Sequence, residues 1–393
     1  MIRHLFKLMW NRKGKNFLLL VEVLASFMVL FGIMTLVVKN YRNYAQPLGF
    51  EYENVWVIET TIDVENEEAV ETMKNLKSVL RNQPEIESLA LMTDNFPFAF
   101  SSSTNSFDYK EEPLTSNSFW VEPEFFDVLR IPIERGKVFD EANINDEGHY
   151  VVVNRKLEET ILDIDPSVDI VGEDIDDAGD RIVTGVIDRF RYASQFMSNQ
   201  NSFFRMYSLN DTNQYFLATA MLVRVKPDAG KEFEQKLMNL LERTNPAWEY
   251  DISWLSEMKT GRDLLVMVPV IIFSIIGAFL LFNVGMGIFG VLWYNINRRR
   301  PEIGLRRALG APAGAIGSQF IGEVMVITTF SVILGLLIAI QFPLMGAFDL
   351  PAQDYFVAMG IALGIIYLIT FLCAWYPSHQ AARIEPAQAL HEE

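Results

Sequence analysis

The stretch Arg298-Arg299-Arg300-Pro301-Glu302-Ile303-Gly304-Leu305-Arg306-Arg307-Ala308-Leu309-Gly310-Ala311 lies between two long apolar runs. Its five arginines against one glutamate predict a short cytoplasmic loop, because loops rich in Lys and Arg are retained on that side of a membrane. Pro301 suits the first turn of a helix, where its missing N–H is not needed. Gly310 and Pro312 are residues that end a helix. The stretch therefore predicts a basic, amphipathic helix of about two or three turns, parallel to the membrane.

Two functions suit such a helix. Its arginines could anchor it on anionic lipid, since each basic residue near a charged leaflet is attracted to the surface. Alternatively it could dock on a soluble partner, with Ile303, Leu305 and Leu309 as the buried contacts and the arginines at the rim. The residue chemistry alone leaves both open.

The run from Glu302 to Ala311 resembles the coupling-helix signature of the MacB/FtsX-type permeases of ABC transporters. This resemblance implies that the helix sits between the second and third spans and rests on a separate ATPase subunit. Pro301 stands where the family usually has a basic residue, and we expect it to sharpen the helix start. The coupling residues implied are Pro301, Glu302, Ile303, Gly304, Leu305, Arg306, Arg307, Ala308, Leu309 and Gly310.

Charge is segregated along the 393 residues. Residues 40–262 hold 21 Lys/Arg and 41 Asp/Glu, a net charge of −20, whereas the remainder carries +3. An acidic, soluble middle is thus inserted between basic, apolar ends. Nucleic acid is excluded as a partner of the middle, because binding it depends on neutralising phosphates. Cys373 is the single cysteine, so no disulfide forms within the chain.

Four apolar runs are long enough to span a bilayer: 17–38, 264–293, 316–342 and 355–376. The first is too long for a signal-peptide core, and no small-x-small cleavage site follows it promptly. We therefore expect a multi-pass membrane protein with both termini in the cytoplasm, and the resemblance implies the bacterial cell (inner) membrane. The other segments are an interfacial helix at 1–16, an extracytoplasmic domain at 39–263, a cytoplasmic loop with the coupling helix at 294–315, a short outer loop at 343–354 and a cytoplasmic tail at 377–393.

Small residues recur inside the spans. Gly285, Gly287 and Gly290 match a dinucleotide-binding fingerprint by letter, but they follow no strand and lie in an apolar span. Together with Gly360 and Gly364 they are expected to let helices pack closely in the membrane.

The middle segment mixes strand and helix patterns. Residues 54–62 alternate and are rich in Val, Ile and Thr, which is typical of a strand, and 67–83 present one apolar helical face. Further strands are expected at 86–93, 119–121, 150–154, 181–187 and 220–225, further helices at 123–129, 155–164 and 229–245, and a polar loop at 101–106. The predicted fold class is an α-helical membrane domain of four spans with an inserted α+β extracytoplasmic domain, of two lobes.

This middle also resembles the family's extracytoplasmic domain, with little match between about 195 and 216. The matching pieces are Val121-Glu122-Pro123-Glu124-Phe125-Phe126, Arg135-Gly136-Lys137-Val138-Phe139, Val151-Val152-Val153-Asn154 and Val183-Thr184-Gly185-Val186-Ile187.

Catalytic motifs are missing from the sequence. It has no P-loop, and its four histidines are dispersed without metal-ligand spacing. The run from Asp174 to Asp180 hints at a calcium loop, but Ala178 fills a ligand position and Gly185 stands where a bidentate Glu is needed. A solvated turn is the interpretation adopted, and no cofactor or metal is predicted.

The resemblance covers nearly the whole chain and implies a non-catalytic permease subunit that transmits ATP-driven motion to its extracytoplasmic domain, exporting or extracting a substrate. The implied partners are an ABC ATPase subunit, a second permease chain, membrane lipids, and a periplasmic adaptor or substrate protein. The alternative is an FtsX-like signalling subunit that regulates an extracytoplasmic partner such as a cell-wall hydrolase.

Overall fold

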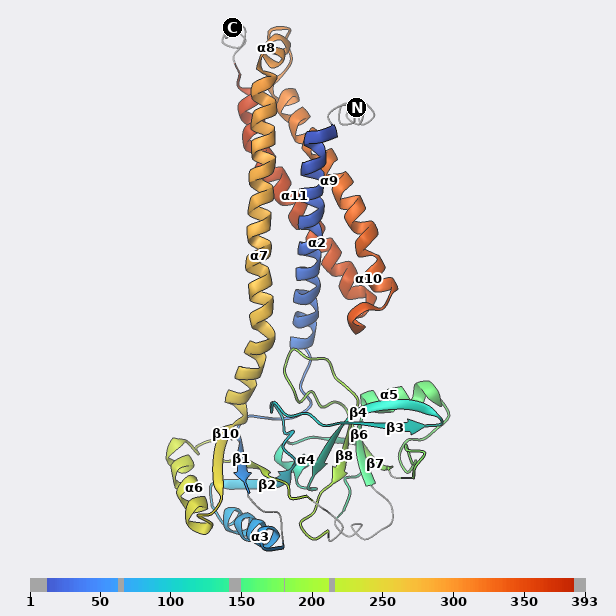
Figure 1. Cartoon of the computed structure of the whole chain (residues 1–393), viewed down its shortest axis with the longest axis vertical. Helices are drawn as coiled ribbons and strands as arrows, with labels where there is room; N and C mark the ends of the chain where they lie inside the picture. The colour runs from blue at the N-terminus through green and yellow to red at the C-terminus, as the bar shows by residue number, and fades with distance from the viewer. Residues whose placement is uncertain (1–12, 63–66, 141–149, 180, 212–215, 385–393) are drawn as a thin grey trace. The chain divides into compact units, whose positions relative to one another are not determined.

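The computed structural model describes residues 13–62, 67–140, 150–179, 181–211 and 216–384. It divides into two compact units (Figure 1). The membrane unit comprises Met1–Arg42 and Met267–Glu393, and the inserted domain comprises Asn43–Val266. The chain passes from one unit to the other inside two helices, α2 (Lys13–Tyr44) and α7 (Leu255–Arg298).

The described part of the membrane unit holds four helices long and apolar enough to cross a membrane: α2, α7, α9 (Ala313–Ala339) and α11 (Ala352–Ala382). Short elements connect them: α8 (Arg300–Ala308), α10 (Gln341–Leu344) and the 3-10 helix η2 (Ala347–Asp349). The four-span fold class is thereby confirmed.

The helices extend beyond the predicted spans. Helix α11 runs through Pro377 to Ala382, so it continues six residues past the predicted span. A proline removes one N–H from the helical ladder. Pro377 is buried, and its packing outweighs that loss. The predicted interfacial helix at 1–16 and most of the tail at 377–393 fall largely outside the described residues.

The described strands of the inserted domain form one mixed sheet of ten. Their order is β10-β1-β9-β2-β4-β8-β6-β7-β5, with β3 paired to β4. The strands are β1 (Val55–Thr61), β2 (Ile86–Met92), β3 (Thr104–Tyr109), β4 (Glu112–Val121), β5 (Ile133–Gly136), β6 (Tyr150–Asn154), β7 (Ile182–Ile187), β8 (Ser202–Met206), β9 (Ala220–Val225) and β10 (Glu249–Trp254). The helices are α3 (Glu67–Arg81), α4 (Phe125–Val128), α5 (Arg155–Ile164) and α6 (Lys231–Thr244).

Burial accounts for this arrangement. Every residue of β9 is buried, as its central place in the sheet requires. Helices α3 and α6 each bury one apolar stripe at helical spacing against the same core, which also contains Trp56 and Val223. A second core, around Leu157 and Phe203, lies beneath α5. The two halves of the sheet meet where β2 pairs with β4 through Met92 and Val121, and one core contains side chains from both halves.

Strands β6 and β9 and helix α5 occur at the predicted residues. The polar loop predicted at 101–106 is partly wrong, because Thr104–Tyr109 forms β3 and pairs with β4 in a hairpin. Thr104 and Ser106 are exposed in this edge strand, where polar side chains are compatible with a strand.

Candidate functional site

Helix α8 contains the arginine-rich stretch. It begins one residue after α7, with Pro301 in its first turn. Leu309 closes its C-terminus through its backbone N–H, and Gly310 follows with φ +95°, a left-handed conformation that glycine adopts without steric cost. The helix contains the predicted coupling residues from Pro301 to Ala308, and the last two of that set follow it.

Charged side chains fix α8 against α9. Arg299 donates from Nη1 to Glu323 Oε1 at 3.1 Å and pairs through Nε with Glu302 Oε2 at 3.2 Å. Glu302 also pairs with Arg306 Nη2 at 2.6 Å, and Arg306 donates to Gln319 Oε1 at 3.0 Å. The network closes where Gln319 donates to Glu323 at 3.1 Å. The sequence placed Glu323 in the third span without indicating this partner.

The apolar residues of α8 divide into two sets. Ile303, only 4% exposed, belongs to the hydrophobic core of the membrane unit, and Gly304 beside it is buried. Leu305 and Leu309 are 53% and 80% exposed. This chain itself therefore covers Ile303, one of the three predicted docking contacts, and leaves the other two exposed.

The span glycines also divide. A Cβ on Gly285 would lie 2.9 Å from Cys373 Sγ, and one on Gly287 would lie 2.8 Å from a Glu22 carboxylate oxygen. These two glycines therefore permit close packing within the chain. Gly290, Gly360 and Gly364 are exposed and would meet nothing within 4 Å. They remain available to lipid or to another chain.

Helices α7 and α11 line an apolar groove of about 450 Å³ in the membrane unit. Its lining is Ala278, Leu281, Phe282, Gly285, Met286, Phe289, Ile369 and Cys373. The most apolar window of α7 is only 6% buried, against 39% for that of α9. Helix α7 thus presents the least covered surface of the four described spans.

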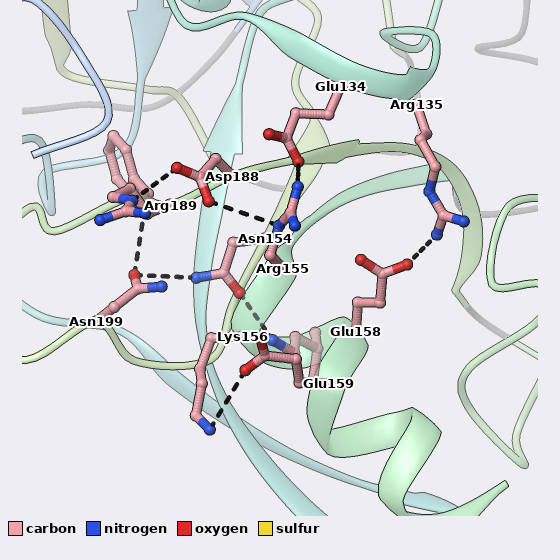
Figure 2. Close-up of polar contacts among 12 residues, drawn as sticks. Glu134, Arg135, Asn154, Arg155, Lys156, Glu158, Glu159, Asp188, Arg189 and Asn199 are labelled. Carbon is pink, nitrogen blue, oxygen red and sulfur yellow. Dashed lines mark hydrogen bonds and ion pairs between the residues drawn. The ribbon is translucent and has the colours of Figure 1, made fainter. Parts of the chain in front are cut away.

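Polar contacts gather around the start of α5 in the inserted domain (Figure 2). Asn154 caps this helix, accepting from Leu157 N at 3.0 Å, and its side-chain amide donates to Gln200 O at 2.7 Å. Arg155 pairs with Glu134 and with Asp188. The ion pairs of this cluster are half-exposed and balanced in charge. They fasten the ends of β5 and β7 to the helix and include no nucleophile or base poised for chemistry.

Asp177, in the acidic run considered above as a calcium loop, caps the turn between β3 and β4. Asp177 accepts from the backbone N–H of Lys110 and Glu111, both at 2.9 Å, at the tip of the β3–β4 hairpin. Those donors, that of Glu111 first, lower the pKa of Asp177 below its usual value. Both turn residues have positive φ, 52° and 69°, so the carboxylate stabilises a strained turn. Among the described residues no group of three or more His, Cys, Asp or Glu is placed to hold a metal ion.

Two buried arginines of the inserted domain were missed from the sequence. Arg191 and Arg224 each donate only to backbone carbonyls among the hydrogen bonds described for them. Burial lowers the pKa of both guanidiniums. For Arg191 the sequence did carry one signal of burial. It lies between two aromatic residues in Phe190-Arg191-Tyr192, and a charge buried among aromatic side chains needs hydrogen-bond acceptors.

The fold and the α8 network define a class: multi-pass membrane proteins with one large mixed-sheet domain inserted between their first two spans. Comparison with known families specifies it further. The MacB-like periplasmic core domain matches residues 23–240, and the FtsX-like permease C-terminal domain matches residues 271–386. The chain belongs to the MacB/FtsX family of ABC transporter permeases.

Its relatives include the macrolide export ATP-binding/permease protein MacB of Neisseria meningitidis serogroup A, 23% identical over 74% of this chain and 46% of the relative. MacB of Escherichia coli K12 is 24% identical over 72% of this chain and 45% of the relative. The chain thus spans about half the length of the curated relatives it matches. The periplasmic region of MacB from Actinobacillus actinomycetemcomitans aligns with 56% of this chain and 96% of its own, with 16% identity and a TM-score of 0.39.

Proposed function

We propose that this chain is the transmembrane permease subunit of an ABC transporter, in which a separate ATPase subunit docks on α8 and drives motion of the inserted domain. The observation that carries the proposal is the pair Leu305 and Leu309, exposed on a helix whose orientation the Arg299 network fixes. A short helix with apolar side chains outward and arginines at its rim is suited to a cleft on a soluble partner.

Magnitudes favour docking over lipid anchoring. Burying a leucine side chain in a partner is worth about 1.5–3 kcal/mol, whereas an exposed ion pair gives about 0–1 kcal/mol. Arg306 already shares Glu302 and Gln319 within the chain, so the charge that it offers to anionic lipid is partly compensated. The leucines supply the attraction in the docking proposal, and the arginines would supply it in the lipid-anchor alternative.

The experiment compares Leu305→Asp with Arg306→Ala in the full chain, purified with its co-expressed ATPase and reconstituted in nanodiscs. ATP hydrolysis stimulated by the permease should fall at least roughly tenfold for Leu305→Asp, the loss that a 1.4 kcal/mol weaker contact causes. Arg306→Ala should retain most of the stimulation. The reverse ranking would contradict docking and support the lipid anchor.

The proposed topology puts α8 and both termini in the cytoplasm and the inserted domain outside. Its support is the arginine loop between α7 and α9 and the net charge of −20 on residues 40–262. In a Cys373→Ser background, a cysteine at Ser102 should react with an impermeant maleimide in whole cells. A cysteine at Ala313 should react only after permeabilisation. Labelling of Ala313 in intact cells would invert the proposed orientation.

A second copy of the chain is the proposed partner of α7, whose surface is the least covered of the described spans. In lipid, helix association depends on close packing rather than on a hydrophobic force. Gly290, Gly360 and Gly364 have open space beside them that could admit another helix. We propose efflux or extraction of an amphiphilic substrate as the output, in line with the names of the relatives as macrolide export proteins.

A further inference from the structure

The segment Arg191–Met197, here named the tether loop, lies within the inserted domain. Arg191 is among its largest fully buried side chains. Its guanidinium folds the loop on itself, donating to Met197 O at 2.9 Å from Nε and to Gln195 O at 2.6 Å from Nη2. Nη1 donates outside the loop, to Gln46 O at 2.8 Å, just beyond the end of α2. One buried cation therefore satisfies the carbonyls of both segments.

Further contacts bind the tether loop to the end of α2. Asn43 Nδ2 donates to Phe196 O at 2.7 Å, and the Tyr44 and Phe196 rings stack with centroids 5.6 Å apart. Gln195 Nε2 donates to Tyr44 O at 3.1 Å and to Gln46 O at 2.8 Å. The last carbonyls of a helix lack intrahelical partners. The tether loop supplies a donor to one of them.

The same loop holds the start of α7. Asp263 accepts from Ser194 Oγ at 2.7 Å and from Gln195 N at 2.9 Å. It is also paired with Lys259, one turn earlier on α7, at 2.7 Å. Arg262 adds a bond from Nε to Ala193 O at 3.2 Å. Both helices that leave the inserted domain are thus bonded to one stretch of seven residues.

The base of the tether loop is pinned to the sheet. Asn199 Oδ1 accepts from Phe190 N at 3.3 Å, which closes the loop, and from Asn154 Nδ2 at 3.4 Å, which ties it to the end of β6 (Figure 2). On the α2 side, Arg191 N donates to Leu48 O at 3.0 Å. Gly49 lies so close to the residues before the tether loop that a Cβ on it would come 2.0 Å from Arg189 O.

We propose that the tether loop is the joint that fastens both α2 and α7 to the sheet of the inserted domain, with Arg191 and Asp263 as its positioning residues. This inference rests on the proposed function for its purpose, because a helix moved by an ATPase shifts the domain only through such a joint. Arg191 bonds the tether loop to the segment after α2 and also holds the loop's own carbonyls together. Asp263 serves the α7 side.

The chain offers a matched control for the loss of a buried arginine. Arg224 is 4% exposed and donates to Val128 O at 2.6 Å, Glu53 O at 3.3 Å and Glu51 O at 3.2 Å. Its three acceptors lie within the inserted domain, and the hydrogen bonds described for it touch neither helix. Arg224→Ala therefore removes a comparable buried guanidinium without opening the joint.

The test measures pulsed-EPR distance distributions in the full chain, in nanodiscs and a Cys373→Ser background. Spin labels at Tyr41 and Asp127 report on α2, and labels at Val268 and Asp127 report on α7. All three sites are exposed. Arg191→Ala should broaden the α2 distribution roughly twofold, since local fastening limits such collective motions. Asp263→Ala should broaden the α7 distribution and leave the α2 distribution narrow. Arg224→Ala should leave both narrow.

Widths unchanged from wild type in both Arg191→Ala and Asp263→Ala would overturn the proposal, as would equal broadening by Arg224→Ala. If Arg191→Ala does not fold, Asp263→Ala on the partly exposed side of α7 decides alone. These widths are measured without nucleotide or ATPase. A failure of ATPase stimulation would therefore refute the proposed function without bearing on the joint. Unchanged EPR widths would refute the joint without bearing on ATPase docking.

Discussion

Helix α7 is held differently at its two ends. At its start, Asp263 and Arg262 bond to a loop that is built around the buried Arg191. At its end, Arg299 and Arg306 share Glu302 and Glu323 in ion pairs. Between the ends, the most apolar window of the helix is 6% buried in this chain.

The two kinds of fastening differ in strength. Hydrogen bonds to charged groups contribute about 1.5–3 kcal/mol each, whereas exposed ion pairs contribute about 0–1 kcal/mol. Arg306 and Glu302 have side chains 48% and 44% exposed, so their pair belongs to the weak class. The hydrogen bonds of Asp263 and Arg262 within the inserted domain therefore belong to the stronger class. At α8 only the exposed Arg306–Glu302 pair can be rearranged by a docking partner at small cost, because Ile303 is buried and the Arg299–Glu323 pair is less exposed.

The largest effect is expected where α8 enters the core of the membrane unit. Ile303→Asp would bury a carboxylate among apolar side chains, a cost of at least about 3–5 kcal/mol. We expect it to abolish recovery of monodisperse protein in fluorescence-detected size-exclusion chromatography. Leu305→Asp, on the exposed face two residues on, should be recovered at wild-type yield. Equal recovery of both variants would mean that α8 is not packed as described.

Two glycines with nearly the same φ test the joint in the inserted domain. Gly49 and Gly172 have φ of +93° and +96°, but only Gly49 has backbone atoms against the position of a Cβ. An alanine costs about 1–2 kcal/mol at either site for the left-handed backbone. Gly49→Ala must also displace Arg189 O, and we expect about 2–4 kcal/mol in total.

Amide hydrogen exchange in the full chain measures this difference. The Arg191 amide, bonded to Leu48 O, should exchange faster in Gly49→Ala by roughly tenfold or more, as about 1.4 kcal/mol of local destabilisation implies. In Gly172→Ala its exchange should stay close to that of wild type. Similar rates in the two variants would show that the close approach at Gly49 contributes nothing to the joint.

Much of the architecture was predictable from the sequence. Apolar runs longer than about 20 residues gave the four spans, and the periodic patterns gave β6, β9 and α5 at their observed bounds. Strand β8, in which Ser202 and Arg205 are buried beside phenylalanines, does not alternate and was missed. A strand covered on both faces carries no period-2 signal.

The joints could not be predicted. Arg191 acts on carbonyls as far away as Gln46, 145 residues earlier, and backbone acceptors leave no trace in the residue types. The pairing of Arg299 with Glu323 depends on how α8 and α9 pack against each other, and residue types alone do not reveal that tertiary contact. Likewise the burial of Ile303 depends on the neighbouring spans, because its side chain and that of Leu305 are alike in hydrophobicity.

The smallest effects are expected at the α8 end, where two ion pairs of different exposure can be compared. Arg299 and Glu323 have side chains 12% and 22% exposed, against 48% and 44% for Arg306 and Glu302. Arg299→Ala leaves the Glu323 carboxylate, on a membrane-spanning helix, with the Gln319 amide as its remaining described partner. We expect a loss of about 1–2 kcal/mol for Arg299→Ala and at most about 0.5 kcal/mol for Arg306→Ala.

Thermal unfolding of the full chain in detergent at low and high salt distinguishes the two pairs. The Debye length falls from about 10 Å at 0.1 M to about 3 Å at 1 M, so the exposed Arg306 pair should lose its effect in 1 M salt while the Arg299 pair keeps most of it. Glu323→Gln should rescue part of the Arg299→Ala loss, because it removes the charge left without its cation. A coupling of about 1 kcal/mol is expected in that double-mutant cycle. No coupling, or a loss from Arg299→Ala that high salt erases, would place this pair in the weak class and leave α8 held only by Ile303.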